Sequence, residues 1–307
     1  MRNSVCNALV ALSGKRSFMF LTGDLGFMAL EGLQEALGEN FINAGISEQN
    51  MVSMAAGIAL SGTSAWVYSI APFCYARPFE QIRNDLCLNQ LPVKLVANGG
   101  GYAYGSMGST HHALEDYGVL STLLPMQIFI PAFGDDVEPI INKMAGLQQP
   151  SYLRLGKCEL PQDFRLPIYS AWRCLLKGEG PLLVVMGPLV GSYLKSFAHM
   201  EPHIRPEIWL VSELPLSFAN IPGAFIKKLS QTSILCVAEE HVAHGGLGQS
   251  LVWLLLKHGI ALPRFLHAYA KGHPSGRYGS QNFHRHECGL DPHSIMQMLE
   301  LESVIYD

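Results

Sequence analysis

The sequence predicts an α/β protein made of two doubly wound domains. Short β-rich runs alternate with helical segments through the first half, which is typical of a parallel sheet covered on both faces. Residues 158–180 then hold two prolines, two glycines and no sustained periodicity, which indicates a linker. A second series of strands starts at Leu182. We therefore expect domains at 1–157 and 181–307.

The strands of the first half are predicted from runs of β-branched and aromatic residues. They lie at Phe18–Leu21, Phe41–Asn43, Ala65–Tyr68, Val93–Ala97, Gln127–Ile130 and Tyr152–Leu155, with helices between them at 28–38, 48–61, 78–89, 113–123 and 135–147. The strands of the second half are predicted at Leu182–Met186, Glu207–Val211, Ile234–Ala238 and Arg264–Leu266. Right-handed crossovers place the loops that follow parallel strands at one edge of the sheet, where α/β proteins bind ligands.

Composition and charge narrow the class of protein. Charged residues make up only 15% of the chain, so we expect part of the surface to be covered by partner chains. The net charge is −4 and no basic cluster is present, which argues against nucleic-acid binding. No apolar run is long enough to span a membrane, and Asn3 and Asn7 interrupt any signal-peptide core. The seven scattered cysteines include no C-x-x-C pair and indicate a reduced, cytoplasmic protein.

One carboxylate stands out at the start of an apolar helix. Glu48 follows the predicted strand Phe41–Asn43 and opens a run of small residues, Val52 to Gly62, that can pack closely on a neighbour. A carboxylate buried at such a position can share a proton with a ring nitrogen. The alternative is a first-turn carboxylate that is stabilised by the helix dipole.

Motifs around Glu48 favour the first interpretation. The segment Gly45–Met51 (G-I-S-E-Q-N-M) resembles the G-I-x-E-x-x-M segment of transketolase-like enzymes that use thiamine diphosphate. Four further segments resemble that family in order and spacing: Thr22–Leu25, Arg77–Arg83, Gly105–His111 and Leu153–Lys157. In the second half, E-E-H at 239–241, G-G-L-G at 245–248 and G-L-D-P at 289–292 resemble the family's C-terminal domain. The resemblance implies a pyrimidine-binding domain followed by a transketolase C-terminal domain.

The resemblance also implies roles for residues of the cofactor site. Glu48 would bind the aminopyrimidine N1′ and drive the tautomer change that activates the cofactor. Phe73 would stack on the pyrimidine, beside Ile70, which stands where the family often has Phe; the alternative for Phe73 is a core side chain. Asp24 and Arg77 are assigned to cofactor binding on the motifs that contain them.

Substrate residues follow from the same comparison. His111 would face the reacting carbon and the substrate oxygens, whereas His112, which replaces a usual Gln, is expected to be structural although it could compete for the role. Gly99 and Met107 stand where sugar-handling members often place a histidine and an aspartate, which puts the substrate in doubt. Tyr102 and Tyr104 are candidates for replacement hydroxyls.

Basic and histidine residues outside these motifs are further candidate ligands. Arg2 and Lys157 resemble in position two basic residues that hold a substrate phosphate, although surface solvation is the ordinary alternative. His241 is placed near the cofactor by resemblance. The spacings at 241–244 and 284–288 do not match closed zinc sites, so no metal site is assigned to this chain.

A missing motif predicts a partner. The family holds the cofactor diphosphate through Mg²⁺ (or Ca²⁺) with a G-D-G segment and a later Asn, and this chain has no such segment. We therefore expect a separate diphosphate-binding N-terminal subunit that holds the metal, in an α2β2 heterotetramer that transfers a two-carbon ketol unit between sugars. Three rivals remain: the β subunit of a 2-oxo acid dehydrogenase, a deoxyxylulose phosphate synthase-like decarboxylating ligase, and a non-catalytic partner-binding remnant.

Overall fold

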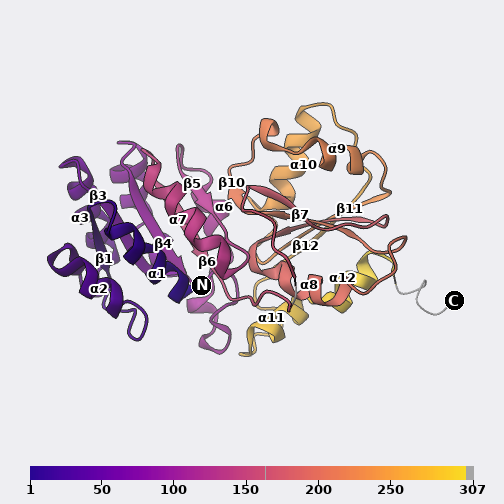
Figure 1. Ribbon diagram of the computed structural model, residues 1–307. Helices are drawn as coiled ribbons and strands as arrows, with labels where there is room; N and C mark the ends of the chain where they lie inside the picture. The colour runs from indigo at the N-terminus through magenta and orange to yellow at the C-terminus, as the bar shows by residue number, and fades with distance from the viewer. Residues whose placement is uncertain (163, 302–307) are drawn as a thin grey trace.

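Two β-sheets lie side by side, and helices cover both faces of each (Figure 1). The computed structural model describes residues 1–162 and 164–301. The first sheet has seven strands in the order β10-β5-β6-β4-β3-β1-β2, and the second has five in the order β12-β11-β8-β9-β7. All neighbouring strands are parallel except the pairs β5–β10 and β7–β9. The predicted class, two α/β domains with parallel sheets, is confirmed.

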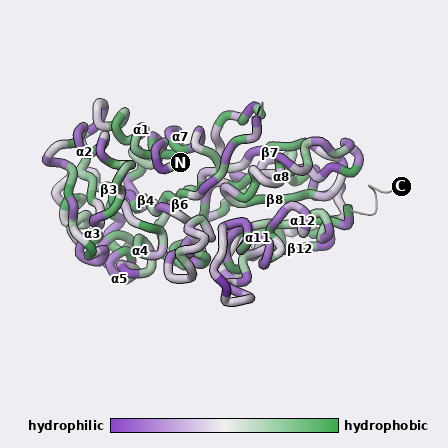
Figure 2. Tube along the Cα trace, turned by 90° about the horizontal axis from the view of Figure 1, so that it is seen from below, coloured by the Kyte–Doolittle hydropathy of each residue, from purple (hydrophilic) through white to green (hydrophobic). Residues whose placement is uncertain are grey.

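The predicted strands are all present. The first sheet contains β1 (Phe18–Thr22), β2 (Phe41–Asn43), β3 (Ser64–Ile70), β4 (Val93–Asn98), β5 (Gln127–Phe129), β6 (Ser151–Leu155) and β10 (Glu213–Leu214). The second contains β7 (Trp172–Leu176), β8 (Leu182–Met186), β9 (Glu207–Val211), β11 (Ile234–Glu239) and β12 (Arg264–Tyr269). The interior strand β8 is apolar along its whole length, which Figure 2 shows by its hydrophobic colouring, because helices cover both of its faces.

Helices cover the first sheet on both faces because alternate strand residues point to opposite sides. Trp66 and Tyr68 of β3 pack with α1 (Arg2–Ser13), α2 (Glu31–Leu37) and α7 (Val137–Gly146). The intervening residues Ala65 and Val67 pack with α3 and its neighbours. The helices of that second face are α3 (Glu48–Leu60), α4 (Ala71–Tyr75), α5 (Phe79–Gln81) and α6 (Asp116–Leu120).

The second sheet is covered in the same way. Val184 of β8 belongs to the core that includes α9 (Gly223–Leu229) and α10 (Leu247–Lys257), above the sheet in Figure 1. Val185 belongs to the core under α8 (Val190–Phe197), α11 (Gln281–Cys288) and α12 (Pro292–Met298). In the described residues no helix is both long and apolar enough to cross a membrane.

Two parts of the predicted organisation are wrong. The expected linker 158–180 contains β7, which pairs antiparallel with β9 and so belongs to the second sheet. The two-residue strand β10 comes from the second half of the chain, yet it pairs with β5 at the edge of the first sheet. The two halves are therefore joined by backbone hydrogen bonds as well as by side chains.

Two predicted helices are shorter or less regular than expected. The segment 78–89 forms the short helix α5 followed by a π-helix at Ile82–Cys87. The segment 113–123 is helical only from Asp116 to Leu120, because Ala113 forms a bridge with Gly101.

A buried ion pair and a buried arginine tie the two halves together. Asp136 of the first half binds Arg173 of β7, with Oδ1 and Nη1 2.7 Å apart. Arg154 of β6 donates from Nε to Asp116 Oδ2 at 2.8 Å and from Nη2 to the carbonyl of Glu240 in the second half. Each of these charged side chains is at most 4% exposed, so each requires its partner.

Candidate functional site

Four strand ends meet at one edge of the first sheet. The register aligns Thr22 of β1 with Asn43 of β2, and Ile70 of β3 with Asn98 of β4. Because these strands are parallel, the loops that follow them lie at the same edge. Those loops carry Asp24, Glu48, Phe73 with Arg77, and His111, so the topology gathers the predicted cofactor residues in one region.

Glu48 is buried at the start of α3. Its side chain is 4% exposed, and Ser47 before it makes no side-chain capping bond. Arg77 reaches back from the turn after α4 and places Nη1 3.0 Å from both oxygens of the Glu48 carboxylate. The pair borders an open hollow of 560 Å³ that is lined by residues 46–50 and Arg77. Glu48 is thus a buried, ion-paired carboxylate and not a first-turn carboxylate that faces solvent.

An aromatic wall continues from this ion pair. The Arg77 guanidinium lies 4.0 Å from the centre of the Phe73 ring. The Phe73 ring meets His111 edge-on at 5.3 Å, and His111 lies 5.9 Å from the ring of Tyr104. Glu48, Arg77, Phe73 and His111 therefore form one continuous series of contacts. Ile70, half-buried, immediately precedes α4.

Asp24 organises the loop beside Glu48. Its carboxylate accepts a hydrogen bond from Asn43 Nδ2 at 3.0 Å, and its backbone N–H donates to Asn43 Oδ1 at the same distance. Asn43 Oδ1 also accepts from the Gly45 N–H. Asp24 has a left-handed φ of 56°, which short polar side chains tolerate. The reciprocal bonds with Asn43 hold the loops after β1 and β2 together.

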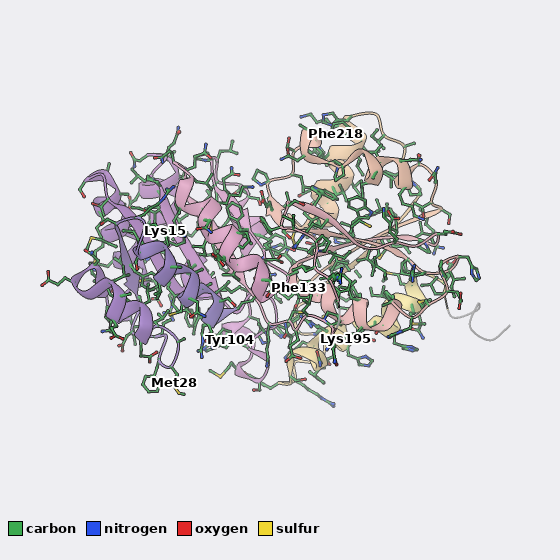
Figure 3. The ribbon with its side chains drawn as sticks, in the orientation of Figure 1. Lys15, Met28, Tyr104, Phe133, Lys195 and Phe218 are labelled. Atoms are coloured by element: carbon green, nitrogen blue, oxygen red, sulfur yellow. The ribbon has the colours of Figure 1, made fainter. Side chains whose placement is uncertain are left out.

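Tyr104 occupies the place where a side chain at position 99 would lie. Gly99 has a φ of +82°, and a Cβ on it would lie 2.1 Å from the Tyr104 ring. The Tyr104 hydroxyl accepts a hydrogen bond from Asn98 Nδ2 at 2.9 Å. Figure 3 shows Tyr104 at the lower edge of the molecule where the halves meet. Sequence reasoning did not assign Asn98, although a polar residue at the end of an apolar strand could have indicated it.

Three predicted residues lie in the seam between the halves and not at the Glu48 hollow. Tyr102 is fully buried and donates its hydroxyl to the Gly272 carbonyl. His112 donates from Nε2 to the Gly105 carbonyl at 2.9 Å, and burial lowers its pKa to about 4. The ring of His241 stacks on Tyr117, with the centroids 3.8 Å apart. These contacts hold Tyr102, His112 and His241 in the seam, and none of the three side chains lines the Glu48 hollow.

The protonation state of His241 follows from its hydrogen bonds. Nδ1 is 2.7 Å from the Val242 carbonyl and so carries the proton, and Nε2 accepts from the Gly118 N–H at 3.1 Å. Burial lowers the pKa of His241, so the ring is neutral. Neither ring nitrogen is left for a substrate.

The adjacent carboxylate of Glu239 is completely buried. It accepts from the Leu247 and Gly248 N–H groups, from His267 Nε2 at 2.7 Å, and from the Tyr117 hydroxyl. Burial alone would raise its pKa, but these hydrogen bonds, with that from His267 the strongest, hold the pKa below the ordinary value. The E-E-H segment therefore joins the halves.

Neither of the two predicted phosphate residues lines the Glu48 hollow. Arg2 is exposed on the first turn of α1. Lys157 is exposed and lines a separate hollow of 460 Å³ together with Lys195 and Arg285. Within the described part of the chain, no group of three or more His, Cys, Asp and Glu side chains could hold a metal ion.

Comparison with known proteins identifies the class that this fold and site define. The family model "Transketolase, pyrimidine binding domain" matches residues 6–162, and the chain belongs to that family. Transketolases depend on thiamine diphosphate. The chain is similar to an apulose-4-phosphate transketolase subunit from Actinobacillus succinogenes, with 29% identity over 85% of this chain and 84% of the relative. The corresponding subunit from Phocaeicola vulgatus is 30% identical, with 82% of each chain covered.

A solved structure agrees over nearly the whole length. The split-gene transketolase described as an inactive β4 tetramer superposes with a TM-score of 0.81 and 26% identity. The match covers 97% of this chain and 96% of that chain. The predicted resemblance to the C-terminal section of a split transketolase is therefore confirmed.

Proposed function

We propose that this chain is the pyrimidine-binding subunit of a split transketolase-type enzyme that transfers a two-carbon ketol unit between sugars. The observation that carries the proposal is Glu48, a buried carboxylate that borders an open hollow beside an aromatic wall. The relatives that are named as transketolase subunits support the same function. As part of this proposal we place the enzyme in the cytoplasm, since its seven cysteines are all free.

The residues present fit the aminopyrimidine of thiamine diphosphate. Thiamine diphosphate supplies a carbon that accepts and releases the ketol unit. Glu48 binds the pyrimidine N1′ and holds a proton there, while Arg77 keeps the Glu48 carboxylate in place. Phe73 stacks on the pyrimidine with the face that Arg77 leaves open. His111 moves a proton at the substrate oxygen.

Tyr104 adapts the site to its sugar in this proposal. Its ring fills the space beside Gly99, where sugar-handling relatives often place a histidine, and its hydroxyl is oriented by Asn98. A phenol replaces an imidazole as the hydrogen-bonding group toward the substrate. The acceptor is to be identified by a screen of phosphorylated and unphosphorylated sugars plus pyruvate, with lipoyl-domain acylation measured in parallel to test the dehydrogenase alternative.

A partner chain completes the site. We assign the diphosphate and its Mg²⁺ (or Ca²⁺) to a separate N-terminal subunit, because this sequence has no G-D-G segment. Three large apolar side chains at the site edge support an interface there: Phe27, Met28 and Ile46 are 83%, 74% and 75% exposed. Figure 3 shows Met28 at this edge of the first half. The proposed assembly is an α2β2 heterotetramer.

The split-subunit proposal predicts that the isolated chain has no ketol transferase activity. Mixing it with the diphosphate-binding subunit restores both activity and saturable binding of thiamine diphosphate, because each chain supplies half of the site. Activity and calorimetric titration of each chain and of the mixture are the measurements. Activity from this chain alone contradicts the split, and a mixture without saturable binding supports a non-catalytic remnant.

Phe73→Leu is expected to weaken thiamine diphosphate binding to the complex about five- to tenfold. The reason is the loss of about 1 kcal/mol of ring stacking at nearly constant apolar area. Isothermal titration calorimetry measures the dissociation constant. Phe218→Leu is the matched control, because Phe218 is also half-buried but stacks on His258 in the second half. Equal dissociation constants for the two variants contradict the stacking role.

A further inference from the structure

The loop that carries His111 is closed at its base. The Gly101 N–H donates to the Ala113 carbonyl at 2.9 Å, and the Ala113 N–H donates back at 3.1 Å. We call residues 102–112 the His111 loop. Its first residue is tied to the second half, because the Tyr102 N–H donates to Glu240 Oε1 at 2.8 Å.

The middle of the His111 loop rests on residues 272–284 of the second half, which we call the clamp segment. A Cβ on Gly108 would lie 2.0 Å from the Tyr278 ring, and one on Gly105 would lie 3.1 Å from the Gln281 nitrogen. Both glycines have left-handed φ values, +82° and +47°. The backbone of the loop thus approaches the clamp segment more closely than any side chain would allow.

The ends of the His111 loop contact the same segment through stacked rings. Tyr102 stacks on His284, with centroids 5.0 Å apart and planes at 17°. His112 stacks on His273 at 5.1 Å and meets His284 edge-on at 4.9 Å. We call His112, His273 and His284 the imidazole cluster. It joins the loop to the clamp segment directly beside His111.

Two rings of the imidazole cluster, His112 and His284, are poorly suited to carry charge. His112 and His284 are 5% and 1% exposed, and His112 Nδ1 and both nitrogens of His284 lack hydrogen-bond partners. Burial lowers the pKa of both rings, and His273 lowers that of His284 further. Titratable or charged groups also face the cluster: Tyr102, Glu240, Arg285, Glu287 and Cys288. The charge of Glu240 is already balanced by Arg285 at 2.8 Å.

We propose that the clamp segment positions His111 by holding its loop, and that the clamp opens when His112 or His284 takes up a proton. The catalytic meaning rests on the proposed function of His111, but the clamp itself can be tested without cofactor or partner. In the released loop an imidazole has a pKa of about 6.5. The clamped form binds fewer protons between this value and about 4, the pKa of clamped His112, so falling pH through that window favours release.

The size of the effect follows from this linkage. At pH 5.5 protonation of His112 on release favours opening about tenfold, and protonation of His284 acts in the same direction, whereas at pH 7.5 neither has much effect. Hydrogen exchange of the full chain measures this as protection of the amides of residues 102–112 at the two pH values, corrected for intrinsic exchange. We expect native protection to fall at least about tenfold between pH 7.5 and pH 5.5.

Two variants distinguish opening of the clamp from a non-specific loosening of the protein at low pH. The double variant His112→Gln/His284→Phe keeps a donor for the Gly105 carbonyl and a ring against Tyr102, and its loop protection should not depend on pH. His286→Gln is the matched control, because His286 lies on the same helix but is 74% exposed. It should behave as the native chain does. Equal native protection at both pH values, or a fall that persists in the double variant, overturns the proposal.

If the double variant fails to fold, the amides of α3 will also lose their protection from exchange. A second measurement, on the native chain, then tests the proposal. Proton NMR of the native chain follows its twelve histidines through a pH titration. Three resonances with pKa values well below 6.5, one of them from His241, support the proposal, and fewer than three overturn it. In the reconstituted enzyme the double variant should keep activity at a lower pH than the native protein. If the reconstituted native enzyme is inactive but the loop still loses protection at low pH, the proposed function is contradicted and the clamp is not.

Discussion

Glu48→Gln will lower ketol transfer by the reconstituted enzyme by more than about 10⁴-fold, beyond the ~10²–10⁴-fold typical of one acid–base group. An amide cannot share a proton with the pyrimidine N1′, so both the activation and the binding of the cofactor suffer. The fold should persist, because glutamine has a similar volume and costs less to bury than a charge. The substitution also leaves Arg77 half-exposed, at 47%, where water can solvate it.

Exchange of the thiamine diphosphate C2 proton, followed by NMR in the assembled complex, separates this role from assembly. The exchange should be far slower in Glu48→Gln than in the native complex. Glu80→Gln is the matched control, because Glu80 is an exposed carboxylate on the neighbouring helix α5. It should leave exchange and activity unchanged. Equal exchange rates in equally assembled native and Glu48→Gln complexes would show that Glu48 is only a helix-start carboxylate.

Asp116→Asn should lower the free energy of unfolding by about 3–5 kcal/mol, the cost of leaving a buried charge without its partner. Asp116 is completely buried, and its Oδ2 accepts from Arg154 Nε and from the Tyr152 hydroxyl, each at 2.8 Å. In the variant the Arg154 guanidinium remains buried without a counter-ion. Because Arg154 also holds the Glu240 carbonyl, the loss should loosen the two halves together.

Urea unfolding followed by circular dichroism measures this change. Lys143→Gln is the control, since it removes a short but exposed ion pair, with Lys143 Nζ 2.6 Å from Glu213 and Lys143 47% exposed. Its effect should be at most about 1 kcal/mol. Similar losses in the two variants would contradict the importance assigned to the buried pair.

The strands were predictable because their apolar runs have to be buried, whatever the order of the sheet. The strands that the sequence did not predict are β7 and β10, whose stability depends on partners distant in the sequence. The β7 strand is flanked by proline and glycine and pairs at a sheet edge with β9. The β10 strand has two residues, too few for any periodic signal, and exists because β5 offers it an edge.

The site residues also divide into those that the sequence alone could place and those that needed the tertiary structure. By itself the sequence determined that Glu48, Phe73, Arg77 and His111 meet, because each follows a parallel strand and all such loops share one edge. Only the tertiary structure decided where Tyr102, His112 and His241 point. Their hydrogen bonds and ring contacts reach across the seam, as from the Tyr102 N–H to Glu240, 138 positions away. Local pattern specifies which edge a loop occupies, but side-chain direction depends on partners that only folding brings near.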